Sequence, residues 1–307
     1  MRILGHIHTF NDNDVLDRSL KALLGQTRPL DAILLVDNGS TDGTLERPFP
    51  SNVTIIRHPE NRGTSGALIT GFRYALENGY DWIWVFDADS MPRQDALAAL
   101  LGFYEKLPAQ MQGKIQLLAA TPSDASRTPQ HGVMFTPDGY EELRYADGQE
   151  AYECHAVIWS GSLFRVETIR AIGLPSPDYV LDWGEFEYGY QGMVRGYKTY
   201  VVRSSIFDHN IGVRSPSHLT TVQIGPLMLS VTSLPPIRLY YLIRNGIFFW
   251  GYQYPKRGIG SYLGVARRFG WIPKYIVKLA LLSRWTELRA CLRGVRDGML
   301  GRMRRRY

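Results

Sequence analysis

The chain has 307 residues, of which 45% are hydrophobic and 12% aromatic, which suits a folded protein with a sizeable core and argues against disorder. Its two cysteines, Cys154 and Cys291, resemble neither a disulfide framework nor a metal motif, which favours a reducing compartment. The net charge of +6 is unevenly distributed: residues 256–307 contain fourteen Lys and Arg against two acids, a charge of +12, so residues 1–255 carry −6 by difference. This acidic body argues against a nucleic-acid partner, because it would repel phosphate backbones.

The first 110 residues alternate between strand-like and helix-like segments. We expect strands at 2–9, 32–36, 53–57 and 82–86, and helices at 14–24, 64–78 and 94–106. This alternation predicts βαβ units and a parallel sheet with right-handed crossovers. Because strand-like sequence starts at residue 2, we expect no signal peptide.

The pattern is looser after residue 120. We expect an irregular insert at 121–149, strands at 152–159 and 198–202, a helix at 166–172, and helices from Leu239 onwards. The longest uncharged run, 219–237, contains three prolines and several hydroxyl residues. It is therefore a poor candidate for a bilayer span.

Carboxylates follow two of the buried strands. Asp87, Ala88 and Asp89 come directly after the most apolar strand, and Asp37 ends another. In an open α/β sheet, ligands bind outside the carboxyl ends of the strands, and paired oxygen ligands there suit a hard divalent ion shared with phosphates. The alternatives are that Asp87 and Asp89 form a turn and cap the helix near Arg93, and that Asp37 only caps its own turn.

Three further segments carry polar groups of possible catalytic or binding use. The loop 61–66 enters a helix, so its backbone N–H groups and Arg62 are suited to a phosphate, although taken alone the pattern favours simple capping of the helix by Thr64. The acidic segment 182–188 has three carboxylates, whose mutual repulsion would raise the pKa of at least one of them and so suit a general base. The alternative is that the segment is the acidic start of a helix. His209 is taken alone more often a structural residue than a ligand, and no zinc spacing is present.

Taken in order, these segments resemble family 2 glycosyltransferases with the GT-A fold. The matching segments are 9–11, 26–29, 36–44, 61–63 and 87–89. Later segments resemble those of rhamnosyl- and galactofuranosyltransferase-like members: 160–161, 180–188, 208–212 and the Tyr-Tyr-x-x-Arg-Asn element at 240–245. The resemblance implies an α/β chain with a mostly parallel central sheet flanked by helices and a C-terminal helical extension. It assigns 1–250 to a catalytic domain, with a nucleotide-binding half (about 1–120) and an acceptor half (about 150–250), and 251–307 to a basic amphipathic extension.

The resemblance also implies a nucleotide-diphospho-sugar donor, Mg²⁺ or Mn²⁺, inversion at the anomeric carbon, and a role in cell-surface polysaccharide synthesis. The donor-binding residues that it implies are Thr9, Asn11, Asp37, Asn38, Arg62, Gly63, Asp87, Ala88 and Asp89. The metal ligands would be Asp89 and His209, with Asp87 contacting either ribose or metal.

On the acceptor side, Glu185 matches the position of the family's catalytic base. Relatives commonly have Asp there, so Asp182 is the substitute candidate; Gln191 is a second departure, where many relatives carry Arg. The acceptor-side residues are Trp159, Ser160, Gly161, Trp183 and Glu187. For the two tryptophans, packing in the core is the alternative to stacking on a sugar.

The basic tail allows two interpretations. Arg289, Arg293 and Arg296 flank an apolar stripe of Leu288, Leu292 and Val295, as in a helix that binds an anionic membrane surface. Such a surface suits a cytoplasmic enzyme at the inner face of the membrane that acts on a glycan or lipid-linked acceptor. Alternatively, the helix packs on its own domain or on a second subunit. The rival class is a non-catalytic nucleotide-sugar-binding or scaffold protein that keeps the fold.

Overall fold

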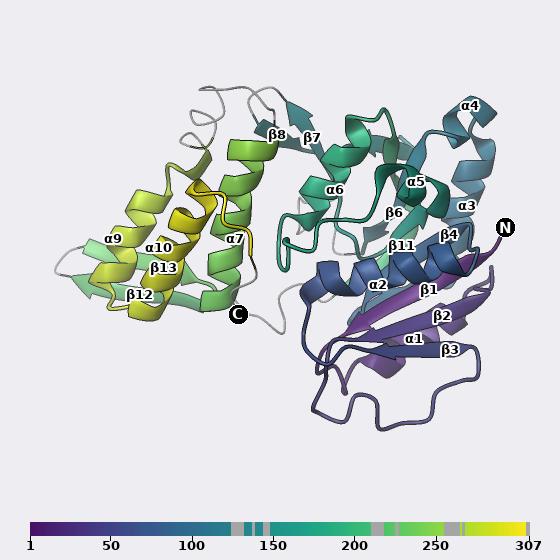
Figure 1. The fold of residues 1–307 in the computed structure, drawn as a ribbon, viewed down its shortest axis with the longest axis horizontal. Helices are drawn as coiled ribbons and strands as arrows, with labels where there is room; N and C mark the ends of the chain where they lie inside the picture. The colour runs from purple at the N-terminus through teal and green to yellow at the C-terminus, as the bar shows by residue number, and fades with distance from the viewer. Residues whose placement is uncertain are drawn as a thin grey trace. The chain divides into compact units, whose positions relative to one another are not determined.

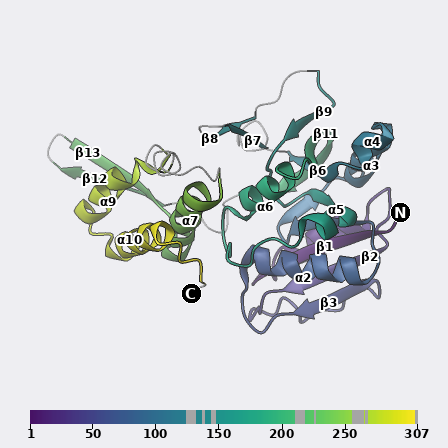
Figure 2. The same cartoon turned by 45° about the horizontal axis from the view of Figure 1, so that its top comes forward.

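The computed structural model describes residues 1–123, 132–136, 139–143, 148–209, 218–224, 227–254, 265 and 268–304 (Figures 1 and 2). The chain forms two compact units. Unit 1 comprises Met1–Phe135, Tyr140–Pro177 and Tyr188–Asn210, and unit 2 comprises Thr136–Gly139, Asp178–Glu187 and Ile211–Tyr307.

A mixed sheet forms the centre of unit 1. In the described part of the chain it has nine strands, in the order β3-β2-β1-β4-β10-β6-β11-β5, with β9 paired to β11. The strands are β1 (Ile3–Thr9), β2 (Ala32–Asp37), β3 (Val53–Arg57), β4 (Trp82–Asp87), β5 (Ser90–Pro92), β6 (Ile115–Pro122), β9 (Ala151–Cys154), β10 (Ser162–Arg165) and β11 (Lys198–His209). The first four in the order are parallel, whereas β10 is antiparallel to both of its neighbours. The expected α/β class with a parallel core is confirmed.

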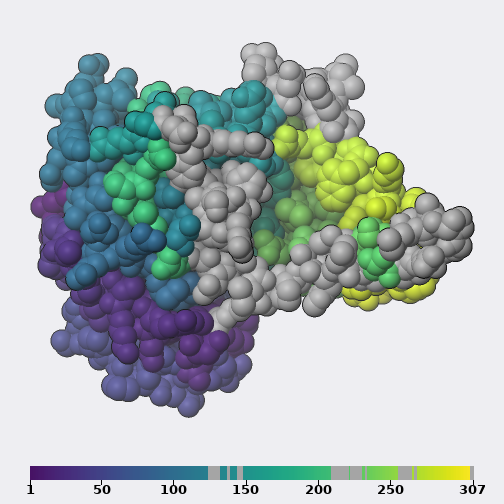
Figure 3. Space-filling view, turned by 180° about the vertical axis from the view of Figure 1, so that it is seen from behind, coloured from purple at the N-terminus to yellow at the C-terminus, as the bar shows by residue number. Residues whose placement is uncertain are grey.

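Helices cover both faces of this sheet, which explains why its central strands are apolar throughout. Successive side chains of β4 point to opposite faces: Trp84 joins one core cluster, and Val85 joins the other. The first cluster includes side chains of α1 (Leu16–Leu24) and α3 (Ala96–Lys106), whose side of the unit is seen in Figure 3. The second includes side chains of α2 (Gly63–Glu77) and α5 (Val166–Ile172). The described residues before 210 also include a short helix α4 (Ala109–Gln112), a small hairpin of β7 (Val133–Thr136) and β8 (Gly139–Glu142), and α6 (Gly184–Met193).

A buried histidine lies between β1 and α2. His6 is fully buried, and its Nε2 lies 3.3 Å from the carbonyl oxygen of Ala67. A Cβ on Gly71 would come within 2.4 Å of the imidazole ring, so this glycine makes room for it. Burial, with a smaller contribution from neighbouring His8, lowers the pKa of His6 to about 3.

We expect the free energy of unfolding to fall as the pH is lowered from about 6.5 toward 3. Unfolded His6 takes up a proton near pH 6.5, whereas folded His6 stays neutral, so the unfolded state binds more protons in this range. At pH 5 this difference in proton uptake lowers the free energy of unfolding by up to about 2 kcal/mol relative to neutral pH. Urea unfolding at neutral pH and near pH 5 measures it. His6→Gln should make the free energy of unfolding less dependent on pH in this range. An equal change of that free energy with pH in the variant and the wild type would show that His6 is not its cause.

Unit 2 is built around α7 (Pro236–Phe248) and α10 (Trp285–Met299), with α9 (Ile272–Leu281), the π-helical turn η1 (Phe249–Gln253) and a hairpin of β12 (His218–Ile224) and β13 (Leu227–Ser233). Small residues of α10 let it approach α7 closely. A Cβ on Gly294 would lie 2.9 Å from the carbonyl oxygen of Tyr240, and one on Gly298 would lie 2.8 Å from that of Arg244. The long continuous part of unit 2, from Ile211 onwards, contains both α7 and α10, and the expected boundary at residue 250 falls between these two helices.

The uncharged run 219–237 contains most of the hairpin and the first residues of α7. None of the helices in the described ranges is both long enough and apolar enough to cross a membrane.

Candidate active site

The carboxyl ends of three parallel strands meet at one edge of the sheet in unit 1. β1 lies between β2 and β4, and the register places Thr9 beside Asp37 and His8 beside Asp87. Both carboxylates therefore flank the end of β1, as the sequence pattern predicts. The backbone N–H of Asn38 donates to the carbonyl of Thr9 and fixes the start of the next loop.

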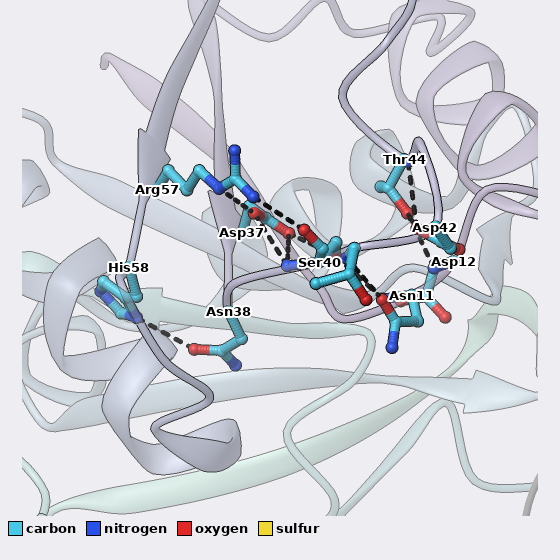
Figure 4. A network of polar contacts seen from close by, with 10 residues as sticks. Asn11, Asp12, Asp37, Asn38, Ser40, Asp42, Thr44, Arg57 and His58 are labelled. Carbon is cyan, nitrogen blue, oxygen red and sulfur yellow. Dashed lines mark hydrogen bonds and ion pairs between the residues drawn. The ribbon is translucent and has the colours of Figure 1, made fainter.

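The loops after β1 and β2 are tied together by side-chain hydrogen bonds (Figure 4). Asn11 has a positive φ of 57°. Its side-chain Oδ1 accepts a hydrogen bond from the backbone N–H of Thr41, and its backbone N–H donates to the hydroxyl of Ser40. The N–H of Asp12 donates to the hydroxyl of Thr44 at 3.0 Å. These contacts explain why residues 36–44 contain so many short polar side chains, because several of them satisfy backbone groups of an irregular loop.

Asp37 is fully buried, and its carboxylate is already engaged. It accepts hydrogen bonds from the N–H and hydroxyl of Ser40, and it forms an ion pair with Arg57 at 3.3 Å (Figure 4). Arg57 also donates to the carbonyl of Ser40. The contacts of Asp37 therefore match the alternative that it caps the turn after its own strand.

Asn38 holds the start of α2. Its Nδ2 donates to the carbonyl of Gly63 at 3.2 Å, and its Oδ1 accepts from Nδ1 of His58 at 2.9 Å. Burial above all, and then the charge of Arg62, lowers the pKa of His58, which favours the neutral ring. Gly63 has a φ of +70°, which favours glycine, and it opens the helix directly after exposed Arg62. An exposed arginine beside helix N–H groups can bind a phosphate.

Asp87 and Asp89 lie in and directly after β4. Asp87 accepts from Nε2 of His8 at 2.8 Å, and its N–H donates to the hydroxyl of Ser160 at 3.2 Å. Asp89 lies in the turn between β4 and β5. Helix α3 begins only at Ala96, so the alternative that Asp89 caps this helix is wrong, whereas a turn at this position is confirmed.

The register of β5 and β11 places the backbone of His209 opposite Ser90, the residue after Asp89. The position of the His209 side chain lies outside what the structure describes. Among described residues no group of three or more His, Cys, Asp or Glu side chains is arranged to hold a metal. The oxygen ligands that suit Mg²⁺ or Mn²⁺ are present in Asp87 and Asp89, and the backbone of the expected third ligand, His209, lies opposite the residue that follows Asp89.

Ser160 and Gly161 link β4 to the neighbouring strands. The Ser160 hydroxyl donates to that of Ser90, and the N–H of Gly161 donates to the carbonyl of Val85. Gly161 has a φ of +80°, and a Cβ there would come within 2.8 Å of the Phe207 ring. Trp159, only 4% exposed, packs in the second core cluster, which favours its packing interpretation.

The acidic segment belongs to unit 2, where α7 holds its backbone. Asn245 donates to the carbonyls of Leu181 and Asp182, at 2.7 and 3.1 Å. Fully buried Arg244 donates to the carbonyl of Asp178 at 2.5 Å. The Tyr-Tyr-x-x-Arg-Asn element thus fixes the segment that carries the candidate bases.

Asp182 and Trp183 have positive φ values of 55° and 68°. Oδ1 of Asp182 accepts from Arg238 at 3.3 Å, whereas its buried Oδ2 has no hydrogen-bond partner within the described ranges. Burial raises the pKa of Asp182, and Arg238 partly opposes this rise. Glu185 lies in the first turn of α6, as does Glu187, which is 6% exposed.

Trp183 packs among aromatic rings of unit 2. Its ring centroid lies 4.8 Å from that of Phe186 and 6.0 Å from that of Phe249, and its Nε1 donates to the carbonyl of Leu242. These contacts match the packing alternative for Trp183.

Sequence reasoning missed three residues that shape these sites: His8, Arg57 and Asn38's partner His58. The place of His8 in the sequence could have identified it. It is the second-last residue of a strand that ends at the same edge of the sheet as the strand of Asp87. Arg57 ends β3 in the same way, beside Asp37 in the register.

Comparisons with known proteins agree with this geometry. The family model "Glycosyl transferase family 2" matches residues 6–171, more than half of the chain. Galactofuranosyltransferase GlfT1 of Mycobacterium tuberculosis is 33% identical over 171 residues, 53% of this chain and 55% of the relative, so the match spans about half of that relative's length. The dTDP-rhamnosyl transferase RfbF of Shigella flexneri is 23% identical over 74% of each chain. Among solved structures, mannosyltransferase PcManGT from Pyrobaculum calidifontis, in complex with GDP-Man and Mn²⁺, has a TM-score of 0.57 at 13% identity and covers 98% of this chain and 87% of its own. The fold of this chain is that of the GT-A glycosyltransferases.

Proposed function

The chain belongs to glycosyl transferase family 2, and from this premise we propose that it is an inverting, metal-dependent hexosyltransferase that uses a nucleotide-diphospho-sugar. The observation that carries the proposal is the sheet edge at which Asp37 and Asp87 flank the end of β1 and Asp89 follows in the next turn. A nucleotide diphosphate needs polar contacts at its base and ribose, cationic or N–H groups at its phosphates, and hard ligands for its metal. This edge offers all three.

On the donor side, the loops after β1 and β2 would bind the base and ribose. Because Ser40 and Arg57 occupy the carboxylate of Asp37, we infer that Asp37 acts mainly by shaping the loop that meets the base. Arg62 and the helix start at Gly63 would face the diphosphate. The donor-binding set is Thr9, Asn11, Asp37, Asn38, Arg62, Gly63, Asp87, Ala88 and Asp89.

Asp89, with His209 and Asp87, would hold Mg²⁺ or Mn²⁺. An ion held by these residues would supply positive charge beside the leaving nucleoside diphosphate, on which negative charge develops. His8 orients Asp87 through their 2.8 Å contact, and the Ser160 hydroxyl fixes the backbone of Asp87.

For the acceptor, Glu185 or Asp182 would take the proton from the attacking hydroxyl. The pKa of Asp182, raised by burial, suits a general base, while Glu185 is at the position that the family resemblance implies for the base. We propose that the acceptor is a glycan or a lipid-linked glycan in cell-surface polysaccharide synthesis, reached at the inner face of the membrane. Ser160, Gly161 and Glu187, with the two tryptophans Trp159 and Trp183, would line or support the acceptor side.

The test is a donor panel with released nucleotide as the readout. The panel includes a dTDP-rhamnosyl donor and galactofuranosyl donors, the sugars in the relatives' names. We expect nucleotide release from one donor of the panel, with loss of release in EDTA and recovery with Mn²⁺ or Mg²⁺. The anomeric configuration of the product, measured by NMR, tests inversion. Nucleotide-sugar binding without release or transfer would instead support the non-catalytic alternative.

A further inference from the structure

Helix α10 has two opposite faces of different character. At 100° per residue, Ala290, Gly294 and Gly298 share one side, and Trp285, Leu288 and Leu292 share the other. The small-residue face is buried and lies against α7. The larger apolar residues therefore face away from α7, which inverts the usual arrangement in a surface helix.

The outer face of α10 is exposed and hollowed. Trp285 is 62% exposed and Leu292 is 49% exposed. A shallow open groove on this face is lined by Trp285, Leu288, Arg289, Leu292, Arg293 and Arg296. The neighbouring helix α9 adds further exposed apolar side chains, including Val277 and Leu281 at 56% each, and Trp271 precedes it at 43%. Exposed large side chains gathered on one unit mark an interaction surface rather than scattered surface residues.

The charges of this region separate between the two faces. Residues 256–307 contain two acids, Glu287 and Asp297, and both lie on the inner face. Glu287 pairs with Arg284, and fully buried Asp297 binds the Tyr240 hydroxyl at 3.0 Å and Arg296 at 3.0 Å. The outer face thus combines tryptophan, leucine and arginine side chains, and none of the acids of this segment belongs to it.

We propose that the outer face of α10 docks on an anionic lipid bilayer surface. Tryptophan and leucine would enter the headgroup boundary, while Arg289 and Arg293 meet the anionic headgroups. Charge also decides against a second copy of this chain, because a two-fold contact would place the arginines of both copies together. The surface contains none of the residues proposed for sugar transfer, so it stands independently of the proposed function.

Flotation of the full chain with vesicles tests this surface. We expect binding to vesicles of equal parts phosphatidylglycerol and phosphatidylcholine, weak binding to phosphatidylcholine alone, and release at high salt. Arg289→Gln with Arg293→Gln should weaken partitioning by about thirtyfold, and the Lys pair should keep most of it. Trp285→Ser with Leu292→Ser should reduce it at least as strongly. These point variants are preferable to truncation, which would strip α7 of its partner.

Two controls carry changes of the same kind on unit 1: Arg73→Gln with Arg170→Gln matches the charge variant, and Leu24→Ser matches the Leu292→Ser half of the apolar variant. Both should bind vesicles as the wild type does, and thermal melting should show that all variants remain folded. Equal binding by the α10 variants and the wild type would overturn the proposal. So would a dimer in light scattering that the Trp285→Ser, Leu292→Ser variant dissociates, since a second copy would then occupy the face.

Discussion

Replacing Asp89 with alanine is expected to lower the rate of sugar transfer at least about a thousandfold, because the leaving diphosphate would lose its metal-borne neutralisation. Asp89 lies in the turn between β4 and β5 and is only partly buried, so the substitution should change the melting temperature little. Transfer assays and calorimetric titration of the nucleotide, with and without Mn²⁺, measure both consequences. The metal-dependent part of nucleotide affinity should disappear.

Asp95→Ala is the matched control, because Asp95 is an exposed carboxylate six residues further along and precedes α3. It should transfer sugar at the wild-type rate. Full activity of Asp89→Ala would remove Asp89 from the metal site. Asp87→Asn distinguishes the two roles proposed for Asp87. A lower nucleotide affinity even without metal would indicate a contact with ribose, whereas a loss of affinity only in the presence of Mn²⁺ would indicate metal ligation.

The second large effect concerns the base. Glu185→Gln is expected to bind the donor normally and to lower kcat by about a thousandfold, because the amide cannot accept the proton of the attacking hydroxyl. The same substitution at Asp182, Asp182→Asn, should cost less if Glu185 is the base. The measurements are kcat as a function of pH and donor affinity for both variants.

The pH profile separates the two candidates. Burial raises the pKa of Asp182, so if Asp182 is the base, kcat should fall on the acid side at a pH above the ordinary carboxyl range. If this fall disappears in Asp182→Asn, Asp182 and not Glu185 is the base. Glu167→Gln on α5, an exposed carboxylate with no proposed role, should leave kcat unchanged. Wild-type turnover in Glu185→Gln would exclude Glu185 as the base.

Local patterns were sufficient for the parallel half of the sheet. The uninterrupted apolar run of β4 and the carboxylates that follow it predict a buried strand ending at a polar edge, and the register confirms that Asp37 and Asp87 flank β1. The helix at 166–172 also has the bounds expected from its spacing.

Elements defined by distant partners were not predictable. β5 exists because Ser90–Pro92 pairs with the end of β11, more than a hundred residues away, and no local signal distinguishes it from a helix cap. β11 runs on to His209 although polar residues follow Val202, because its register shifts between Val202 and Ile206 and then resumes pairing. β6 lies in the centre of the sheet and was missed; its apolar run adjoins the segment expected to be irregular.

The faces of α10 show a different limit. Its leucine stripe is the stronger hydrophobic signal, yet the buried face is the one with Ala290, Gly294 and Gly298. Only the partner helix decides this, because close approach to α7 leaves no room for a side chain at the two glycines.

The dependence of α7 on α10 also sets an order of events during synthesis. Asn245 and Arg244 hold the backbone of residues 178–182, and α7 in turn packs against a helix that ends at Met299. A nascent chain that has reached only residue 250 lacks this support, so the segment with the candidate bases would become ordered only after nearly all of these 307 residues have been translated. Such an enzyme would acquire its activity late, when the surface of α10 is also complete.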